Sequence, residues 1–435
     1  MIIKTKSESY VVTRAEYLFL FLAVLCLGQA LPITQGGMES FQFSTDGLNY
    51  SAILFKVFLL LYSIVLLRMR KTGINIIPKV LLEIIIIWGI LQVFKYRMFS
   101  PYPIIRILNL WFAFAMYYIY GRRIFPIFEQ IIYVLSWCAL VGWILTITMS
   151  PLMLALAKAS PFEARALAEG NSFIVYAIAD SFGILRRNLG FAWEPGRFGS
   201  ILSIGLLVNL FLNNFNLKNN KHFFIILGAL LSSQSTTAYM AMIAVIVIYL
   251  YNKKVKYIIL LLPIAIILIF YMLSLEFMGD KIKSLWFSDQ RSYEWETELD
   301  YYRQQDGYLV PQRFEGMMYE AMNIMHDPIL GNATSPDSYL YSLFQIHFSL
   351  SNGFLRIFAN MGLFIGTLYY ILLYKASKGL AFLFKYKGSI AFMLVFILIN
   401  ISYSWIFEPL FLAMLIIGYY NFNFNKVRTI KNNVI

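Results

Sequence analysis

Most of this chain consists of long apolar runs that are separated by short turns rich in lysine and arginine. A helix that crosses a bilayer needs roughly 20 mostly apolar residues, and basic residues collect at its cytoplasmic ends. These two rules predict single spans over residues 14–33, 51–67, 78–94, 104–120, 127–149, 197–212, 257–275, 352–374, 392–405 and 407–420. The basic turns, such as 68–71 and 121–123, then fall on the same side of the membrane at nearly every crossing.

Residues 223–251 are too long for one span and too short for two. Lys221 precedes this run and Lys253 follows it, so both of its ends are expected on the cytoplasmic side. The pattern favours a hairpin of two short helices that turns at 232–237, where hydroxyl groups can satisfy backbone groups beside a cavity. One long tilted helix is the alternative. With this hairpin included, the sequence predicts an all-α polytopic membrane protein with about twelve transmembrane helices and both termini in the cytoplasm.

Two hydrophilic segments are expected outside the membrane on the opposite side. Residues 150–196 form a first periplasmic loop that carries several arginines, and residues 276–351 form a large periplasmic loop that holds about half of the carboxylates. Residues 294–300 of the large loop alternate acidic with bulky side chains, which favours a solvated surface over a cation site. The whole chain, 1–435, is predicted to be one multi-pass transmembrane domain.

Composition supports this class and narrows the chemistry. The 435 residues are 60% hydrophobic and only 14% charged, a balance that excludes a soluble globular protein. The net charge of +13 does not indicate a nucleic-acid partner, because the basic residues lie in turns between apolar runs. Cys26 and Cys138 are isolated and the chain has three histidines, so no metal, redox site or cofactor is predicted. The basic residues before the first run lack a following cleavage site, and we expect a retained first span.

The segment 186–199 concentrates charge between two apolar runs, because it contains Arg186, Arg187, Glu194 and Arg197. Ionisable groups near membrane depth are costly, so such a cluster indicates a functional site. The planar guanidinium fork matches phosphate oxygens, which predicts an anionic substrate. The alternative is a set of interfacial arginines that reach lipid phosphates. Glu194 precedes a proline and is therefore expected to have an extended backbone.

Chemistry on the outer side of the membrane requires a substrate that arrives already activated. The sequence has no Gly-x-x-x-x-Gly-Lys-Ser/Thr loop, so ATP hydrolysis by that route is not supported. A sugar linked to a lipid diphosphate is activated and is delivered within the membrane. Arginines would stabilise the charge that develops on its leaving group.

Four stretches of this chain also resemble a known family. Arg-Asn-Leu-Gly-Phe-Ala-Trp-Glu-Pro-Gly at 187–196 resembles a stretch of Wzy-type O-antigen polymerases and of the related O-antigen ligases. Three further stretches resemble the family and occur in the same order along the chain. They are Leu-Ser-Ser-Gln-Ser-Thr-Thr-Ala at 231–238, the Arg313 region at 311–316 together with Asp-Pro-Ile-Leu-Gly at 327–331, and residues 351–355 together with 360–366. The resemblance covers roughly residues 186–366. The ligases carry His-x-His-Asn where this chain has Ser-Leu-Ser-Asn at 349–352, which favours a polymerase.

The resemblance implies a metal-independent, inverting glycosyltransferase that joins oligosaccharide repeat units carried on polyprenyl diphosphate, such as undecaprenyl diphosphate, into O-antigen or another polysaccharide. It implies that Arg187 and Arg313 hold the diphosphates of donor and acceptor. Glu194 either accepts the proton of the acceptor hydroxyl or orients Arg187 or Arg197, and the orienting role is favoured. His347 is the other candidate for the proton. The other substrate-binding candidates are Arg186, Arg197, Arg165 and Asn352. Expected partners are the two lipid-linked glycans, the bilayer, a chain-length regulator and a flippase. The alternatives are a ligase of the same superfamily and a transporter of lipid-linked sugars that does no chemistry.

Overall fold

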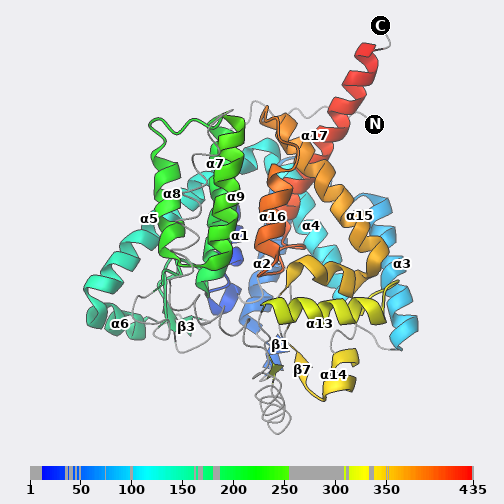
Figure 1. Cartoon of the computed structure of the whole chain (residues 1–435), viewed down its shortest axis with the longest axis horizontal. Helices are drawn as coiled ribbons and strands as arrows, with labels where there is room; N and C mark the ends of the chain where they lie inside the picture. Colours follow the sequence, from blue (N-terminus) through cyan, green and yellow to red (C-terminus); the bar gives the residue numbers. More distant parts are fainter. Residues whose placement is uncertain are drawn as a thin grey trace.

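The computed structural model describes residues 12–34, 38, 43–44, 47–48, 50–73, 75–97, 101–160, 163–164, 170–179, 187–253, 308–309, 313–332, 338–348, 350 and 352–433. This part of the chain is mostly helical (Figure 1). Its helices are α1 Arg14–Gly28, α2 Tyr50–Met69, α3 Lys79–Tyr96, α4 Tyr102–Tyr120, α5 Ile124–Thr148, α6 Ser150–Ala159, α7 Pro195–Leu212, α8 Lys221–Ser232, α9 Thr236–Asn252, α13 Arg313–His326, α14 Ser338–Phe344, α15 Gly353–Leu383, α16 Ala391–Asn400 and α17 Pro409–Asn433. The predicted span 257–275 and the acidic run 294–300 lie outside the described residues.

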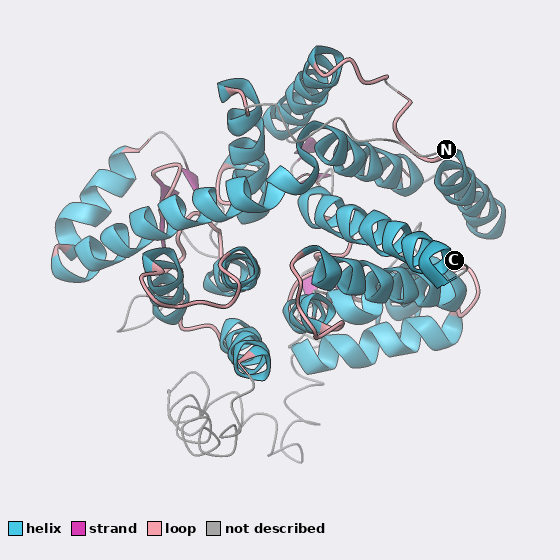
Figure 2. Cartoon of the chain, turned by 90° about the horizontal axis from the view of Figure 1, so that it is seen from above, coloured by secondary structure: helices cyan, strands magenta, loops and turns pink. Residues whose placement is uncertain are grey.

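Strands form only small patches between the helices (Figure 2). They are an antiparallel pair β1 Phe43–Ser44 and β2 Gly47–Leu48, an antiparallel set β3 Glu163–Ala164, β4 Gly170–Ser172 and β5 Ala177–Ala179, and a parallel pair β6 Tyr308–Leu309 and β7 His347–Phe348. Short 3-10 turns occur at Pro32–Thr34 (η1) and Gly121–Arg123 (η2). None of these pairs builds a core, which belongs to the helices.

Within the described residues, four helical segments are long and apolar enough to cross a membrane. They are Tyr50–Met69, Tyr102–Thr148, in which η2 joins α4 to α5, Pro195–Leu212 and Gly353–Leu383. Shorter apolar helices, α6, α8, α9, α16 and the first part of α17, pack among them. The predicted boundaries of the first spans agree with α2 to α5 to within a few residues, because apolar length and basic turns set both.

Helix α7 is the centre of the helical bundle. Its apolar window is 94% buried, whereas those of Tyr50–Met69 and Gly353–Leu383 are 33% and 39% buried. A helix that is apolar on all sides belongs in a core, and α7 packs against α1, α5, α8, α9 and α16. Glycines allow close approach: a side chain at Gly199 would meet Ala238 at 2.3 Å, and one at Gly205 would meet Ile132 at 2.8 Å.

One end of the bundle collects the basic turns, and we call it the basic end. Arg70 at the end of α2 pairs with Glu16 at the start of α1, with Nε and Oε1 2.6 Å apart. The Tyr120 hydroxyl at the end of α4 donates to the Glu16 carbonyl at 2.6 Å, and Arg122 donates to Asn421 of α17 at 2.7 Å. Helix ends that the sequence places on one side of the membrane therefore lie together.

We call the opposite end the loop end. It carries the helices α6, α13 and α14 and the break between α8 and α9 (Figure 1). Here the backbone N–H of Trp193 donates to the Gly28 carbonyl at 3.1 Å, and Gln29 pairs with Ala192 in an isolated β-bridge. The N–H of Asn188 donates to the Ser232 carbonyl at 3.0 Å. The arginine-bearing segment thus crosses the ends of α1 and α8.

The predicted break in residues 223–251 is confirmed, and the alternative of one long helix is wrong. Helix α8 ends at Ser232, Gln234 has a positive φ of 49°, and Ser235 caps the start of α9 by accepting from the N–H of Ala238. Two other predictions differ from the structure. The span 14–33 ends as a helix at Gly28, and the span 352–374 is not one straight helix, because Gly362 interrupts α15 with φ 81° and ψ 168°. The loop 150–196 also contains helix α6 and three short strands.

Candidate functional site

Hydrogen bonds fix the arginine-bearing segment to the break between α8 and α9. The half-buried Arg187 donates from Nη2 to the carbonyl of Gln234 at 2.8 Å. The fully buried Asn188 donates from Nδ2 to the Ser232 hydroxyl at 2.8 Å and to the Ala139 carbonyl at 3.2 Å. Two of the stretches that carry the family resemblance are therefore in direct contact.

The turn after Asn188 depends on a glycine. Asn188 Oδ1 accepts from the N–H of Gly190 at 2.9 Å, as an Asn side chain does when it organises a turn. Gly190 has a φ of +53°, and a side chain there would lie 2.3 Å from the ring of Phe198. Only glycine combines this backbone conformation with such a close contact. The turn brings the chain to Glu194 at the start of α7.

Glu194 is the N-cap residue of α7, and its backbone is extended with φ −144° and ψ 141°, as the following proline predicts. Its side chain is half-buried, and Pro195 takes the first helical position, where its missing N–H costs nothing. The N-terminus of a helix favours negative charge. The start of α7 therefore holds a carboxylate in a suitable place beside the arginine-bearing segment.

Arg197 has partners within the protein. It is 5% exposed, its Nε donates to the carbonyl of Leu27, and its guanidinium lies 4.2 Å from the centre of the Trp405 ring. These contacts join the start of α7 to the end of α1 and to the loop before α17. They give Arg197 a packing role in addition to the substrate-binding role predicted from the sequence.

Asn352 also has two structural contacts. It caps α15, because its Oδ1 accepts from the N–H of Leu355 at 3.0 Å, while its Nδ2 donates to the carbonyl of Ile401 at 3.0 Å. The next residue, Gly353, packs so closely on Tyr403 and Ser404 that a side chain would lie 2.6 Å from their backbone atoms. The start of α15 is thus fixed to the loop that follows α16.

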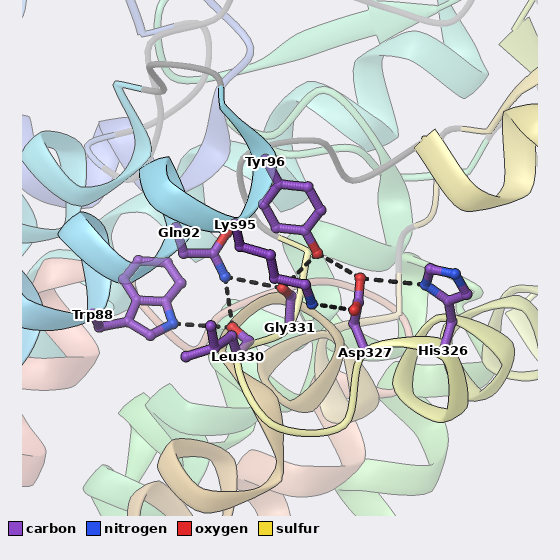
Figure 3. Close-up of polar contacts among 8 residues, drawn as sticks. All are labelled: Trp88, Gln92, Lys95, Tyr96, His326, Asp327, Leu330 and Gly331. Atoms are coloured by element: carbon purple, nitrogen blue, oxygen red, sulfur yellow. Dashed lines mark hydrogen bonds and ion pairs between the residues drawn. The ribbon is translucent and has the colours of Figure 1, made fainter.

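A second polar cluster, drawn in Figure 3, joins α3 to the connection after α13. Asp327, which is 7% exposed, receives hydrogen bonds from Lys95 and Tyr96 of α3, and His326 Nδ1 lies 3.3 Å from its Oδ2. Burial of this carboxyl opposes its ionisation. The hydrogen bonds and the charge of Lys95 outweigh that effect, so the pKa of Asp327 is lower than its ordinary value. The cluster joins elements about 230 residues apart in the sequence through one carboxylate.

The loop that follows Asp327 is held by its backbone. The Leu330 carbonyl accepts from the Trp88 indole at 3.0 Å and from Gln92 at 2.6 Å, and the Gly331 carbonyl accepts from Gln92 and from Tyr96, both at 2.9 Å (Figure 3). On its other side this loop enters the break in α15. The N–H of Leu363 donates to the Pro328 carbonyl at 2.7 Å, so the stretches 327–331 and 360–366 are also in contact.

The other predicted site residues are described only in part. Arg313 is the first residue of α13, and His347 pairs with Tyr308 between β7 and β6; in both cases the structure describes the backbone and not the side chain. Arg165 and Arg186 lie outside the described residues. Among the described residues, no group of three or more His, Cys, Asp or Glu side chains is placed to hold a metal ion.

Buried charges near the start of α17 form a feature of which the sequence indicates only Glu408, through a Glu-Pro pair that repeats the one at Glu194. Glu408 is fully buried and interacts electrostatically with Lys56 of α2, which is 5% exposed. Arg106 of α4 lies between two rings, 4.0 Å from the centre of Phe407 and 4.1 Å from that of Tyr102. A single cation within an apolar run was the available signal for Lys56 and Arg106.

Comparisons of this chain with protein-family models, curated proteins and solved structures gave no match. The chemistry of the loop end therefore has to be argued from its own residues. It holds half-buried Arg187 against the break between α8 and α9, which is rich in hydroxyl groups, and it holds the half-buried carboxylate of Glu194 at the start of α7. A guanidinium and a helix N-terminus both favour an anionic group, and a half-buried carboxylate can accept a proton from a hydroxyl.

Proposed function

We propose that this chain is a membrane glycosyltransferase that joins oligosaccharide repeat units carried on polyprenyl diphosphate. The acceptor sugar hydroxyl attacks the anomeric carbon of the donor, and the bond from that carbon to the diphosphate oxygen breaks. The diphosphate departs as an anion, and the hydroxyl proton passes to a base. One displacement of this kind inverts the anomeric centre, and it requires neither a metal ion nor a cofactor.

The observation that supports this proposal is the contact between sequence stretches that resemble the polymerases. The stretch at 187–196 bonds to the break at 232–234, and the loop at 327–331 bonds to the break in α15. Both pairs belong to the loop end of the bundle. A reaction between two membrane-bound lipids needs groups held in fixed positions beside them, and such contacts between distant segments supply that rigidity.

In this proposal Arg187 and Arg313 bind the diphosphates of the two lipid-linked glycans, and Arg186, Arg165 and Arg197 assist. Glu194 is the favoured base among the described side chains, because it is a half-buried carboxylate at the start of α7, in the same stretch as Arg187. His347 is the other candidate, and Asn352 would orient the substrate from the start of α15. Charge on the departing diphosphate is stabilised best by arginines already in place before the reaction.

The proposal includes a topology of about twelve spans in the bacterial inner membrane. The basic end would face the cytoplasm and the loop end the periplasm, which agrees with the rule that basic residues stay inside. The grouping of Arg70, Tyr120 and Arg122 at one end of the bundle supports this orientation.

A transporter of lipid-linked sugars is the second candidate, and one structural feature favours it. Transporters often have two broken helices at corresponding positions. The break at Gly362 adds a second broken helix to the one between α8 and α9. A ligase gains no such support.

The test is turnover of a purified lipid-diphosphate repeat unit by the protein in nanodiscs, with native chain, Arg187→Ala and Arg313→Ala. Arg68→Ala is the matched control, because Arg68 is an exposed cation at the basic end. A ladder of lengthening glycans that disappears in both site variants and persists in the control would support the proposal. Absence of a ladder, together with translocation of the same lipid in liposomes, would reject the enzyme and leave the transporter.

A further inference from the structure

An apolar groove of about 380 Å³ lies between α3, α4, α15 and α17. Along α3 its lining runs from Pro78 to Trp88, about 15 Å at 1.5 Å per residue. On α17 it reaches Tyr419 and Tyr420, near the basic end. The lining is almost entirely aliphatic and aromatic, so the groove favours a hydrocarbon occupant over water.

The length of the groove suits a hydrocarbon chain. A chain that lies along it contacts apolar side chains of α3 over about 15 Å. A bilayer lipid supplies such a chain. A partner helix is the other apolar occupant, and the filled variants described below distinguish the two.

Exposed apolar side chains surround the groove. Ile86, Ile87 and Ile90 of α3 and Phe364 and Ile371 of α15 are exposed large apolar side chains, with Phe364 78% exposed. Such an apolar surface on helices of this length is typical of contact with a bilayer. A hydrocarbon chain of a bilayer lipid can enter the groove without crossing water.

Basic side chains gather where the groove ends near Tyr420. Arg122 is exposed and bonds to Asn421, the next residue of α17, and Lys378 Nζ lies 5.5 Å from the centre of the Phe422 ring. Lys375 directly precedes the lining residue Ala376, and Lys79 follows Pro78. The carboxylate of Glu83 lies 3.5 Å from Lys79, so the group keeps a net positive charge. This charge complements an anionic headgroup.

We propose that the groove binds an acyl chain of an acidic bilayer phospholipid, whose headgroup contacts Arg122 and Lys378. Basic side chains between transmembrane helices at the membrane surface attract anionic lipids, and each contributes about fivefold to affinity. The charged contacts lie at the basic end, and the proposal does not depend on the proposed function. In the orientation predicted from the basic turns, it belongs to the cytoplasmic leaflet.

The test is native mass spectrometry of the full chain titrated with phosphatidylglycerol or phosphatidylcholine. We expect the native chain to prefer phosphatidylglycerol. We expect Arg122→Ala with Lys378→Ala to weaken that lipid about 25-fold, at about fivefold for each side chain, with little effect on phosphatidylcholine. The control is Lys218→Ala with Lys221→Ala, which removes the same charge from the turn between α7 and α8.

A second pair of variants tests the groove itself. Ile84→Trp and Leu368→Trp each fill the groove from a half-buried lining position. Both variants should bind the acidic lipid more weakly than the native chain does. Their thermal unfolding temperatures should stay near the native value. Equal affinity for the two lipids, or binding that is unchanged by the charge variants or by both filling variants, would overturn the proposal. Displacement of the phospholipid by a lower concentration of polyprenyl phosphate would also overturn the proposal, because the groove would then belong to that lipid. A native chain that is a dimer, with filled variants that are monomers, would overturn it too, because the groove would then be an interface between two copies.

Discussion

Gly362 is the residue whose replacement tests the contact between the 327–331 loop and the break in α15. Its backbone, with φ 81° and ψ 168°, lies in a region that is essentially restricted to glycine. A Cβ atom at this position would also lie 1.9 Å from the carbonyl oxygen of Ile329. Gly362→Ala therefore has to change the α15 backbone, displace the loop, or both.

The expected cost follows from these two effects. A strained backbone of this kind costs about 1–3 kcal/mol in a residue with a side chain. Displacement of the loop breaks two backbone hydrogen bonds, from Leu363 to the Pro328 carbonyl and from Asn332 to the Ala359 carbonyl. At about 0.5–1.5 kcal/mol each, the total loss of unfolding free energy is about 2–6 kcal/mol.

The measurement is reversible unfolding in mixed micelles of increasing SDS fraction, followed by circular dichroism. Gly73→Ala is the control, because nothing lies within 4 Å of a side chain there, and we expect a change of less than about 0.5 kcal/mol. If Gly362→Ala is as stable as the native chain, the loop does not enter the α15 break and the argument for a rigid loop end fails. Under the proposed function, the same variant should also lose polymerisation activity while it remains folded at low SDS.

Three further predictions use the same unfolding assay. Asn188→Ala should cost about 2–4 kcal/mol, because it leaves the buried N–H of Gly190 without its acceptor and removes the hydrogen bonds from Nδ2 to the Ser232 hydroxyl and the Ala139 carbonyl. The exposed Asn216→Ala should cost about 0.5 kcal/mol, and equal losses would contradict the role of Asn188. Gly379→Ala should cost about 1–3 kcal/mol, because its Cβ would lie 1.7 Å from a carbonyl oxygen of α17, and a neutral result would mean that α15 and α17 are farther apart. The pKa of Asp327 is lowered on folding, so its contribution to stability is present above about pH 4 and is lost as the pH falls further. Below about pH 4 the native chain should therefore lose more unfolding free energy than Asp327→Asn. Parallel curves of unfolding free energy against pH would refute the ion pair.

Apolar length and basic turns predicted the helices α2 to α5 and the grouping of their basic ends. They also predicted the break between α8 and α9, because Lys221 and Lys253 flank a run of the wrong length. The break in α15 was missed. Its cause is one glycine whose positive φ is stabilised by a loop about 30 residues earlier, and no local pattern encodes that contact.

The candidate site could be predicted only as residue types. The motif at 187–196 indicated arginines, a carboxylate and an extended Glu194, and the backbone of Glu194 agrees. The sequence did not show that Arg197 packs on Trp405, since the two residues are about 200 positions apart. The Glu-Pro pair pointed to Glu408, but the sequence did not indicate its electrostatic interaction with Lys56, because the two residues are about 350 positions apart.

The central place of α7 explains why its start is a suitable position for chemistry. The apolar window of α7 has a lower mean hydropathy than that of α2, 1.4 against 2.2, yet it is 94% buried whereas that of α2 is 33% buried. The difference lies in its small residues: the Ser200 hydroxyl donates to the Gly196 carbonyl at 2.9 Å and the Ser203 hydroxyl to the Gly199 carbonyl at 2.8 Å, so its surface stays narrow and carries no unsatisfied hydroxyl. Narrow helices let neighbours approach closely in a membrane. Helix α7 packs against five other helices, so a shift of its first turn would disturb the whole core. Glu194 caps that turn. The position of its carboxylate is therefore set by the packing of α7 rather than by the loop that precedes it.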